Sequence, residues 1–267
     1  MTRPPRRRSL GRIMEVHHSH SGSHGNKSWK SLLLEFAMLF AAVTLGFFAE
    51  NLREHHVERE REATFIAAVH TDVLADIAAL RAVVRTQEAR LRHEETLLRL
   101  LEKHSAADLA DLYYTGRVTS LRNFFLRSSN GFQQLKYAGG LRLIGKMEII
   151  RALQAYEGEI DKLEELQSLT EGLLNRYRDQ AAVVFRGTVF RQMYADPMAD
   201  DVYARFRKPE GNPELMTTEP KALNELMVRA IFVHTNGNTT LRWYQALLAE
   251  AEQLAALLEK NYKLKRS

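Results

Sequence analysis

SLLLEFAMLFAAVTLGFFA, residues 31–49, is the stretch that decides the fold, and it contains one charged residue, Glu35. As an α-helix it would span about 28 Å at 1.5 Å per residue, close to the thickness of the hydrocarbon part of a bilayer. Trp29 and Lys30 precede it, and both are residue types that anchor helices at a membrane interface. We therefore expect a transmembrane helix over residues 29–50.

Two other interpretations of this stretch have to be weighed. Its uncharged part, residues 36–49, is short enough for the buried core helix of a soluble domain. Apolar residues on every face of the helix favour lipid instead, because a core helix usually keeps one polar face. A cleaved signal peptide needs a small residue three positions before the cut, and cleavage after Ala49 would place Phe47 there. An uncleaved anchor is expected.

Three residues of the stretch are candidates for contacts inside the membrane. An ionisable residue in a span can mark an ion path or a helix–helix contact, but Glu35 is also close enough to the end to reach the interface. Ala42 and Gly46 are four residues apart, a spacing of small residues that lets two helices approach closely. This spacing predicts a homo-oligomer or a membrane-protein complex.

Residues 1–28 combine an arginine cluster with a histidine-rich tract and offer little apolar surface to bury. We expect a disordered basic, His-rich tail, or a shorter tail without the arginines if Met14 is the true start. The formal net charge of +5 comes from this cluster, so it does not indicate a nucleic-acid partner, and none is expected. The chain has no cysteine, which excludes disulfides, thiolate metal sites and cysteine nucleophiles.

Four histidines of the tail are weak candidates for metal ligands: His17, His18, His20 and His24. Imidazoles on a flexible chain can chelate nickel, copper or zinc. Without a fold to orient the rings such a site would be adventitious, and the alternative is a solvated polar tail. No cofactor is expected.

Beyond the apolar stretch the hydrophobic pattern is helical. Apolar residues recur in steps of three, four or seven as far as His104, in a coiled-coil-like seam. A short helix is expected from Ser105, closed by Gly116, and residues 117–131 are expected to be irregular. A second long helix is predicted over residues 146–185.

The C-terminal third begins with a connector, because residues 187–220 hold four of the six prolines. Two further helices are predicted over 221–235 and 239–262, separated by a turn at Asn236-Gly237-Asn238. No stretch alternates with the period of a strand. The expected fold class is all-α, with one N-terminal transmembrane helix continuing into an elongated antiparallel helical bundle over residues 51–267.

Helix lengths suggest a path for the chain. The first helix would lead about 80 Å from the membrane, and we expect the helix over 146–185 to return antiparallel to it. This places the 187–220 connector near the membrane, where a partner surface is expected. The last helix would then deliver basic residues to the lipid headgroups, namely Lys260, Lys263, Lys265 and Arg266.

Several segments carry a resemblance: MEVHH (14–18), WK (29–30), LEF (34–36), AVTLGF (42–47), AENLREH (49–55) and FQQLKYAGGLRLI (132–144). They resemble a group of uncharacterised bacterial single-span membrane proteins with a His-bearing N-terminus. The resemblance implies location and fold class, and no activity.

The number of Lys and Arg residues on each side of the span predicts its orientation. If Met1 is the start, the count puts the N-terminus in the cytoplasm and the bundle in the periplasm. If Met14 is the start, the count is indecisive.

Motifs that could carry chemistry are incomplete. Gly140 to Lys146 has the spacing of a phosphate-binding loop, but Met147 stands where a hydroxyl residue is needed, so we predict a turn between helices. His93-Glu94 begins like a zinc-protease helix and lacks its second histidine. No catalytic site residue can be assigned, and the chain is expected not to be an enzyme.

The sequence thus favours a non-enzymatic membrane protein whose bundle is a structural, scaffolding or sensory subunit. An accessory subunit of a membrane transport or energy-coupling complex, with Glu35 packed against partner helices, is the main alternative. A membrane-anchored enzyme is the third class, disfavoured by the missing catalytic constellation.

Overall fold

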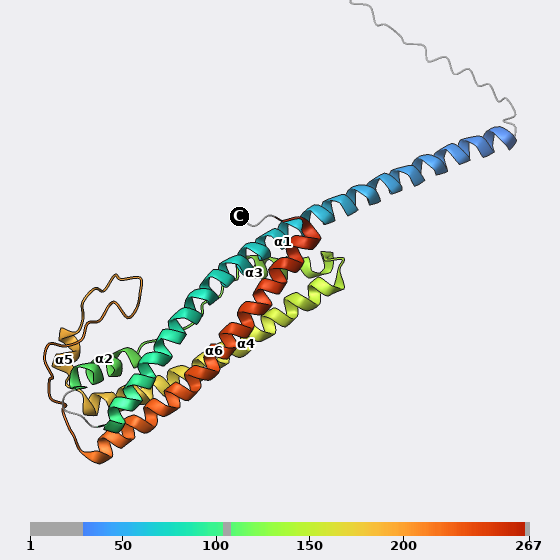
Figure 1. Cartoon of the computed structure of the whole chain (residues 1–267). Helices are drawn as coiled ribbons and strands as arrows, with labels where there is room; N and C mark the ends of the chain where they lie inside the picture. The colour runs from blue at the N-terminus through green and yellow to red at the C-terminus, as the bar shows by residue number, and fades with distance from the viewer. Residues whose placement is uncertain (1–28, 104–107, 265–267) are drawn as a thin grey trace, which may run out of the picture. The chain divides into compact units, whose positions relative to one another are not determined.

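The computed structural model describes residues 29–103 and 108–264, and within these ranges the chain is helical, with one isolated antiparallel bridge between Tyr194 and Phe206. Its elements are α1 (Trp29–Lys103), α2 (Leu109–Thr119), α3 (Asn130–Tyr137), the 3-10 helix η2 (Gly140–Leu143), α4 (Met147–Val184), α5 (Gly187–Gln192) and α6 (Pro220–Tyr262) (Figure 1). The expected all-α fold class is confirmed.

The chain divides into two compact units, Met1–His55 and His56–Ser267, and α1 begins in the first and ends in the second. In the first unit, the described residues form a single helical segment whose side chains are all exposed except that of Thr44, which is half-buried. An 18-residue window of this helix is long and apolar enough to cross a membrane, and none of it is buried. The apolar surface is therefore not covered by any part of the chain that the structure describes.

The second unit is a bundle of three long helices. Helix α6 runs antiparallel to α4, because Lys146 bonds Asn261 near one end and Gln180 bonds the backbone of Ala222 near the other. It also runs antiparallel to α1, since the Tyr262 hydroxyl donates to the Glu62 carboxylate. The last helix thus ends beside the beginning of the bundle, and of the four basic residues expected at the headgroups Lys265 and Arg266 lie outside the described residues.

Helix α4 runs parallel to α1, and the prediction that it returns antiparallel is wrong. Glu62 lies beside Gly145, and Asp76 accepts a hydrogen bond from the Tyr156 hydroxyl at 2.9 Å, so both helices advance in the same direction. The chain must therefore travel back along α1 before α4 begins.

Residues 120–129, which we call the return segment, run back along α1 between α2 and α3 without helix or strand. Arg90 donates to the carbonyl of Thr119 at 3.2 Å, and the backbone N–H of Gly131 donates to Asp72 at 2.6 Å. Residues 119–131 therefore retrace residues 90–72 of α1. An extended chain advances about 3.3 Å per residue against 1.5 Å in a helix, so a short irregular segment spans a long stretch of helix.

The parallel course of α4 moves the proline-rich connector to the opposite end of the bundle from the predicted one. Leu215 and Met216 of the connector lie beside Leu100 and Leu101, near the C-terminal end of α1. The connector begins with the short helix α5, which was not predicted.

Two predicted helix breaks, at Gly116 and at Gly237, are absent, because each glycine lies inside a helix where a neighbouring element packs closely against it. Gly116 lies inside α2, where an added Cβ would meet the ring of Phe185 at 2.4 Å. Gly237 lies inside α6, and a Cβ there would approach Gln87 and Leu91 of α1 at 2.9 and 3.1 Å. Each glycine permits close packing of two elements rather than a turn, so residues 221–262 form one helix instead of two.

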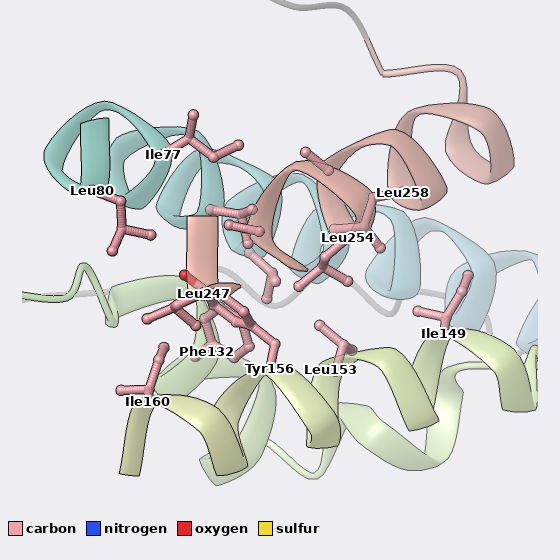
Figure 2. Close-up of a cluster of buried hydrophobic side chains, with 14 of the residues drawn as sticks. Ile77, Leu80, Phe132, Ile149, Leu153, Tyr156, Ile160, Leu247, Leu254 and Leu258 are labelled. Atoms are coloured by element: carbon pink, nitrogen blue, oxygen red, sulfur yellow. The ribbon is translucent and has the colours of Figure 1, made fainter. Parts of the chain in front are cut away.

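The bundle has two main apolar cores. The first core packs α1, α3, α4 and α6 around residues such as Ile77, Leu153 and Leu254 (Figure 2). The second core packs the other end of α1 with α2, α4, α5 and α6 around Leu97 and Tyr177. Each fully buried leucine or isoleucine contributes about 1.5–3 kcal/mol relative to an exposed one. Buried positions of α1 between the two cores are polar, and they define the candidate site.

Candidate functional site: a polar layer between two cores

The predicted membrane contacts lie on the exposed part of α1. Ala42 and Gly46 are exposed, and a Cβ added at Gly46 would meet no atom within 4 Å. Glu35 is exposed on the same helical segment. Gly46 therefore has open space around it in the single chain, which leaves this face of the helix accessible to lipid or to a partner helix.

The tail histidines His17, His18, His20 and His24 lie outside the described residues. Within the described ranges, no group of three or more His, Asp or Glu side chains could hold a metal ion. The weak metal prediction therefore stays a prediction.

The phosphate-loop spacing at Gly140–Lys146 forms the predicted turn. Gly140 is packed against Leu135 and Phe65, and Ile144 is buried in the first core. The N–H of Gly145 donates to the Glu62 carboxylate, and Lys146 bonds Asn261. A carboxylate at the loop would repel a phosphate, so these contacts give the segment a packing role.

Helix α3 is held to α1 by a tertiary cap. The Asp72 carboxylate of α1 accepts hydrogen bonds from the backbone N–H groups of Gly131 and Phe132 at 2.6 and 3.1 Å. Neighbouring Asp76 accepts from Ser128 N–H at 2.6 Å, and burial raises the pKa of Asp76. Carboxylates are favoured at helix N-termini because the first N–H groups have no partner inside the helix.

The polar layer itself centres on a buried ion pair in α1. Nε of Arg90 lies 2.7 Å from Oε1 of Glu94, and the two side chains are 4% and 1% exposed. Arg90 also donates to the Thr119 carbonyl, which joins α1 to the end of α2. Burying a charged pair is stabilising only when hydrogen bonds satisfy the remaining polar atoms, so this pair depends on its surroundings.

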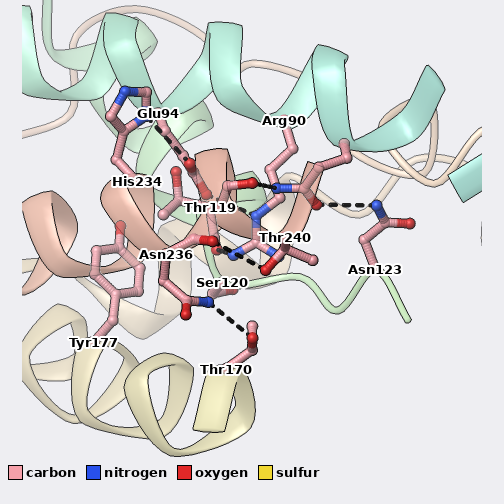
Figure 3. Close-up of polar contacts among 12 residues, drawn as sticks. Arg90, Glu94, Thr119, Ser120, Asn123, Thr170, Tyr177, His234, Asn236 and Thr240 are labelled. Carbon is pink, nitrogen blue, oxygen red and sulfur yellow. Dashed lines mark hydrogen bonds and ion pairs between the residues drawn. The ribbon is translucent and has the colours of Figure 1, made fainter. Parts of the chain in front are cut away.

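His234 of α6 completes the charged part of the layer (Figure 3). Its Nδ1 lies 3.4 Å from Oε2 of Glu94, and its Nε2 lies 3.7 Å from the exposed Glu95. The contact with Glu94 raises the pKa of His234. The contact therefore favours the protonated imidazole, and the charge of this group depends on pH.

Neutral side chains extend the layer across the bundle. Gln87 donates to the Gly237 carbonyl at 3.1 Å and accepts from Asn123 at 3.0 Å. On the α4 side, Asn236 donates to the Thr170 hydroxyl at 2.8 Å (Figure 3). The layer thus ties α1, the return segment, α4 and α6 to one register, because a shift would leave buried polar groups unsatisfied.

Sequence reasoning missed this layer. Val84, Leu91 and Leu98 continue the apolar pattern of α1 in steps of seven, yet they are only half-buried, whereas Gln87 and Glu94 are buried. The available signal was the spacing of Arg90 and Glu94 by four residues on one helix face. Nothing in the sequence pointed to His234 as their partner.

The layer can change its charge by protonation of His234, and it can hold the helices in one register. It combines one arginine, one buried carboxylate and one histidine of raised pKa, without a nucleophile–base pair. Comparison of the chain with models of protein families, with curated proteins and with solved structures found no match.

Proposed function

We propose that the protein is a non-enzymatic, single-pass membrane protein whose helical bundle is a structural, scaffolding or sensory subunit. One observation carries the proposal: the most apolar segment of α1 has no buried residue, although the same helix continues into a well-packed bundle. Exposed apolar surface of this size is costly in water and is favourable in a bilayer.

The polar layer supports a sensory or scaffolding role over a purely anchoring one. An anchor needs no buried charges, and a wholly apolar core would be at least as stable. Buried polar groups favour one register of helices over others. In this proposal the Arg90–Glu94–His234 group fixes the register of α1 and α6.

The proposed location is the bacterial inner membrane, with the bundle in the periplasm. Lipid and a second copy or a larger membrane-protein complex are the proposed partners, through Ala42 and Gly46. Gly46 supports close helix approach because its surface is open in the single chain.

The alternative role, as an accessory subunit of a membrane transport or energy-coupling complex, is favoured by Glu35. A carboxylate in an apolar segment is costly unless it reaches the interface or meets a partner. Glu35 is the one charged residue of the apolar stretch 31–49, and it is exposed in the single chain.

Membrane extraction followed by co-purification tests the proposal. The full chain, expressed at native level, should stay in the membrane pellet after a high-salt wash and be released by mild detergent. Its recovery alone or as a homo-oligomer supports the structural or sensory role. A discrete complex with a polytopic membrane protein supports the accessory role, and release by salt alone would contradict both.

A further inference from the structure

A groove outside the polar layer is formed where α2, α4 and α5 meet. Its volume is about 740 Å³, and three arginines line it: Arg117 of α2, Arg122 of the return segment and Arg178 of α4. A volume of this size matches pockets that hold small organic ligands, which typically measure about 300–1,000 Å³. Three like charges around one groove repel each other, so the arrangement needs an explanation.

Only part of this positive charge is compensated within the described chain. Glu171 accepts hydrogen bonds from Arg122 at 2.8 Å and from Arg178 at 2.9 Å. Among the described residues, no carboxylate lies within ion-pair distance of Arg117, whose side chain bonds the Ser120 hydroxyl at 2.8 Å. Three guanidinium groups and one carboxylate leave two excess positive charges.

The position of Arg117 is fixed by aromatic rings. Its guanidinium carbon lies 4.4 Å from the centre of the Phe206 ring and 6.0 Å from that of Phe190. Burial is the main cause that lowers the pKa of Arg117, and the charge of Arg178 lowers it further. A guanidinium held by its face against a ring keeps its N–H edge available to bind an anion.

The rest of the groove is apolar. Its accessible apolar lining comes from Leu121, Phe190 and Val202, which are half-buried, while Phe185, the residue after α4, is buried beneath it. An inorganic ion would leave this surface in water. A ligand with an apolar body would cover it, at about 25 cal/mol for each Å² buried.

We propose that this groove binds an organic phosphate monoester, with its phosphate against Arg117 and Arg122 and its apolar body against Phe190 and Val202. A phosphate monoester carries about 1.5 to 2 negative charges near neutral pH, which matches the two excess positive charges of the groove. Arginine binds phosphate and carboxylate oxygens alike with paired N–H groups, so the second negative charge is what favours a phosphate monoester over a carboxylate here. The proposal goes beyond membrane attachment and does not depend on it.

The test is calorimetric titration of the full chain in nonionic detergent, with a titration into empty micelles subtracted. The probes are 1-naphthyl phosphate, inorganic phosphate, 1-naphthol and 1-naphthoate. We expect saturable binding of 1-naphthyl phosphate, at least about tenfold tighter than that of each of the other three. Inorganic phosphate lacks the apolar body, 1-naphthol lacks the negative charge, and 1-naphthoate carries one negative charge instead of nearly two. Equal binding of 1-naphthol would overturn the proposal, and equal binding of 1-naphthoate would overturn the choice of a dianion.

Matched arginine substitutions locate the site. Arg117→Gln should weaken 1-naphthyl phosphate binding about tenfold or more, since a hydrogen bond to a charged group is lost, and Arg122→Gln should weaken it severalfold. Arg176→Gln, an exposed arginine of the same helix as Arg178 but outside the groove, should leave binding unchanged. If Arg117→Gln does not fold, as judged by circular dichroism, the exposed Arg122 decides. Wild-type affinity in Arg122→Gln, or equal losses in Arg122→Gln and Arg176→Gln, would refute the site.

Discussion

Replacing Arg90 with methionine should destabilise the bundle far more than the same change at Arg81. Both arginines lie on α1 and pair with a glutamate, Arg90 with Glu94 and Arg81 with Glu252 of α6. The Arg90 pair is 4% and 1% exposed, whereas the Arg81 pair is 57% and 45% exposed. Removing one partner of a buried pair costs about 3–5 kcal/mol, and an exposed pair contributes at most about 1 kcal/mol.

These energies translate into separable melting temperatures. For a domain of 150–250 residues, 1 kcal/mol corresponds to about 2–4 °C, so Arg90→Met should lower Tm by roughly 6–20 °C and Arg81→Met by less than about 4 °C. Circular dichroism of the purified chain in detergent, with heat and with urea, measures both. The double variant Arg90→Met with Glu94→Leu should lose less than the sum of its single variants, because no unpaired charge stays buried. Equal losses at Arg90 and Arg81 would refute the polar layer as an energetic feature.

Three further outcomes are expected. Gly131→Ala should lower the free energy of unfolding by about 1–3 kcal/mol, since its Cβ would lie 2.4 Å from the backbone of Ala68. Gly158→Ala, in open space on α4, should raise it by about 0.5–1 kcal/mol, and urea denaturation measures both changes. The pKa of His234 is raised in the folded chain, so its contact with Glu94 stabilises the fold at pH values below the unfolded pKa, and this stabilisation is lost as the pH rises through the folded pKa. His234→Gln should therefore lower the free energy of unfolding more at pH 5.5 than at pH 8.5. A difference that does not depend on pH would contradict this. Gly46→Ile should reduce crosslinking between copies in membranes, and unchanged crosslinking would argue against the proposed contact.

The long helices were predictable because their apolar residues recur with the helical period over many turns. The predicted end of α1 and both ends of α4 agree with the structure to within about two residues, which is the usual uncertainty of a helix end. The fold class followed from the same pattern together with the absence of alternating stretches. These are properties of local sequence.

The errors came from tertiary contacts. Gly237, between two asparagines, has the local features of a turn, yet α6 passes through it because the missing side chain lets the helix approach Gln87. The direction of α4 could not be predicted either, since it depends on the return segment running back along α1, held at its two ends by Arg90 and Asp72. Long-range partners of this kind leave no periodic trace in the sequence.

The candidate site shares this limitation. Arg90 and Glu94 showed a helical spacing, whereas His234 and the arginine groove draw residues from elements distant in the sequence. Each residue is ordinary by itself, and only the packing of the elements brings the charges together.

Labelling of single cysteines in intact membranes tests the central claim, that residues 29–50 lie in a bilayer and the bundle lies outside it. The natural chain has no cysteine, so each introduced thiol is the only one. The two variants to compare are Leu39→Cys, in the apolar segment, and Met198→Cys, on the connector. Both side chains are exposed in the single chain, Leu39 at 68% and Met198 at 86%. A membrane-impermeant maleimide should label Met198→Cys from one side of the membrane and should leave Leu39→Cys unlabelled until detergent is added. Equal labelling of both variants in intact membranes would contradict the membrane-spanning segment.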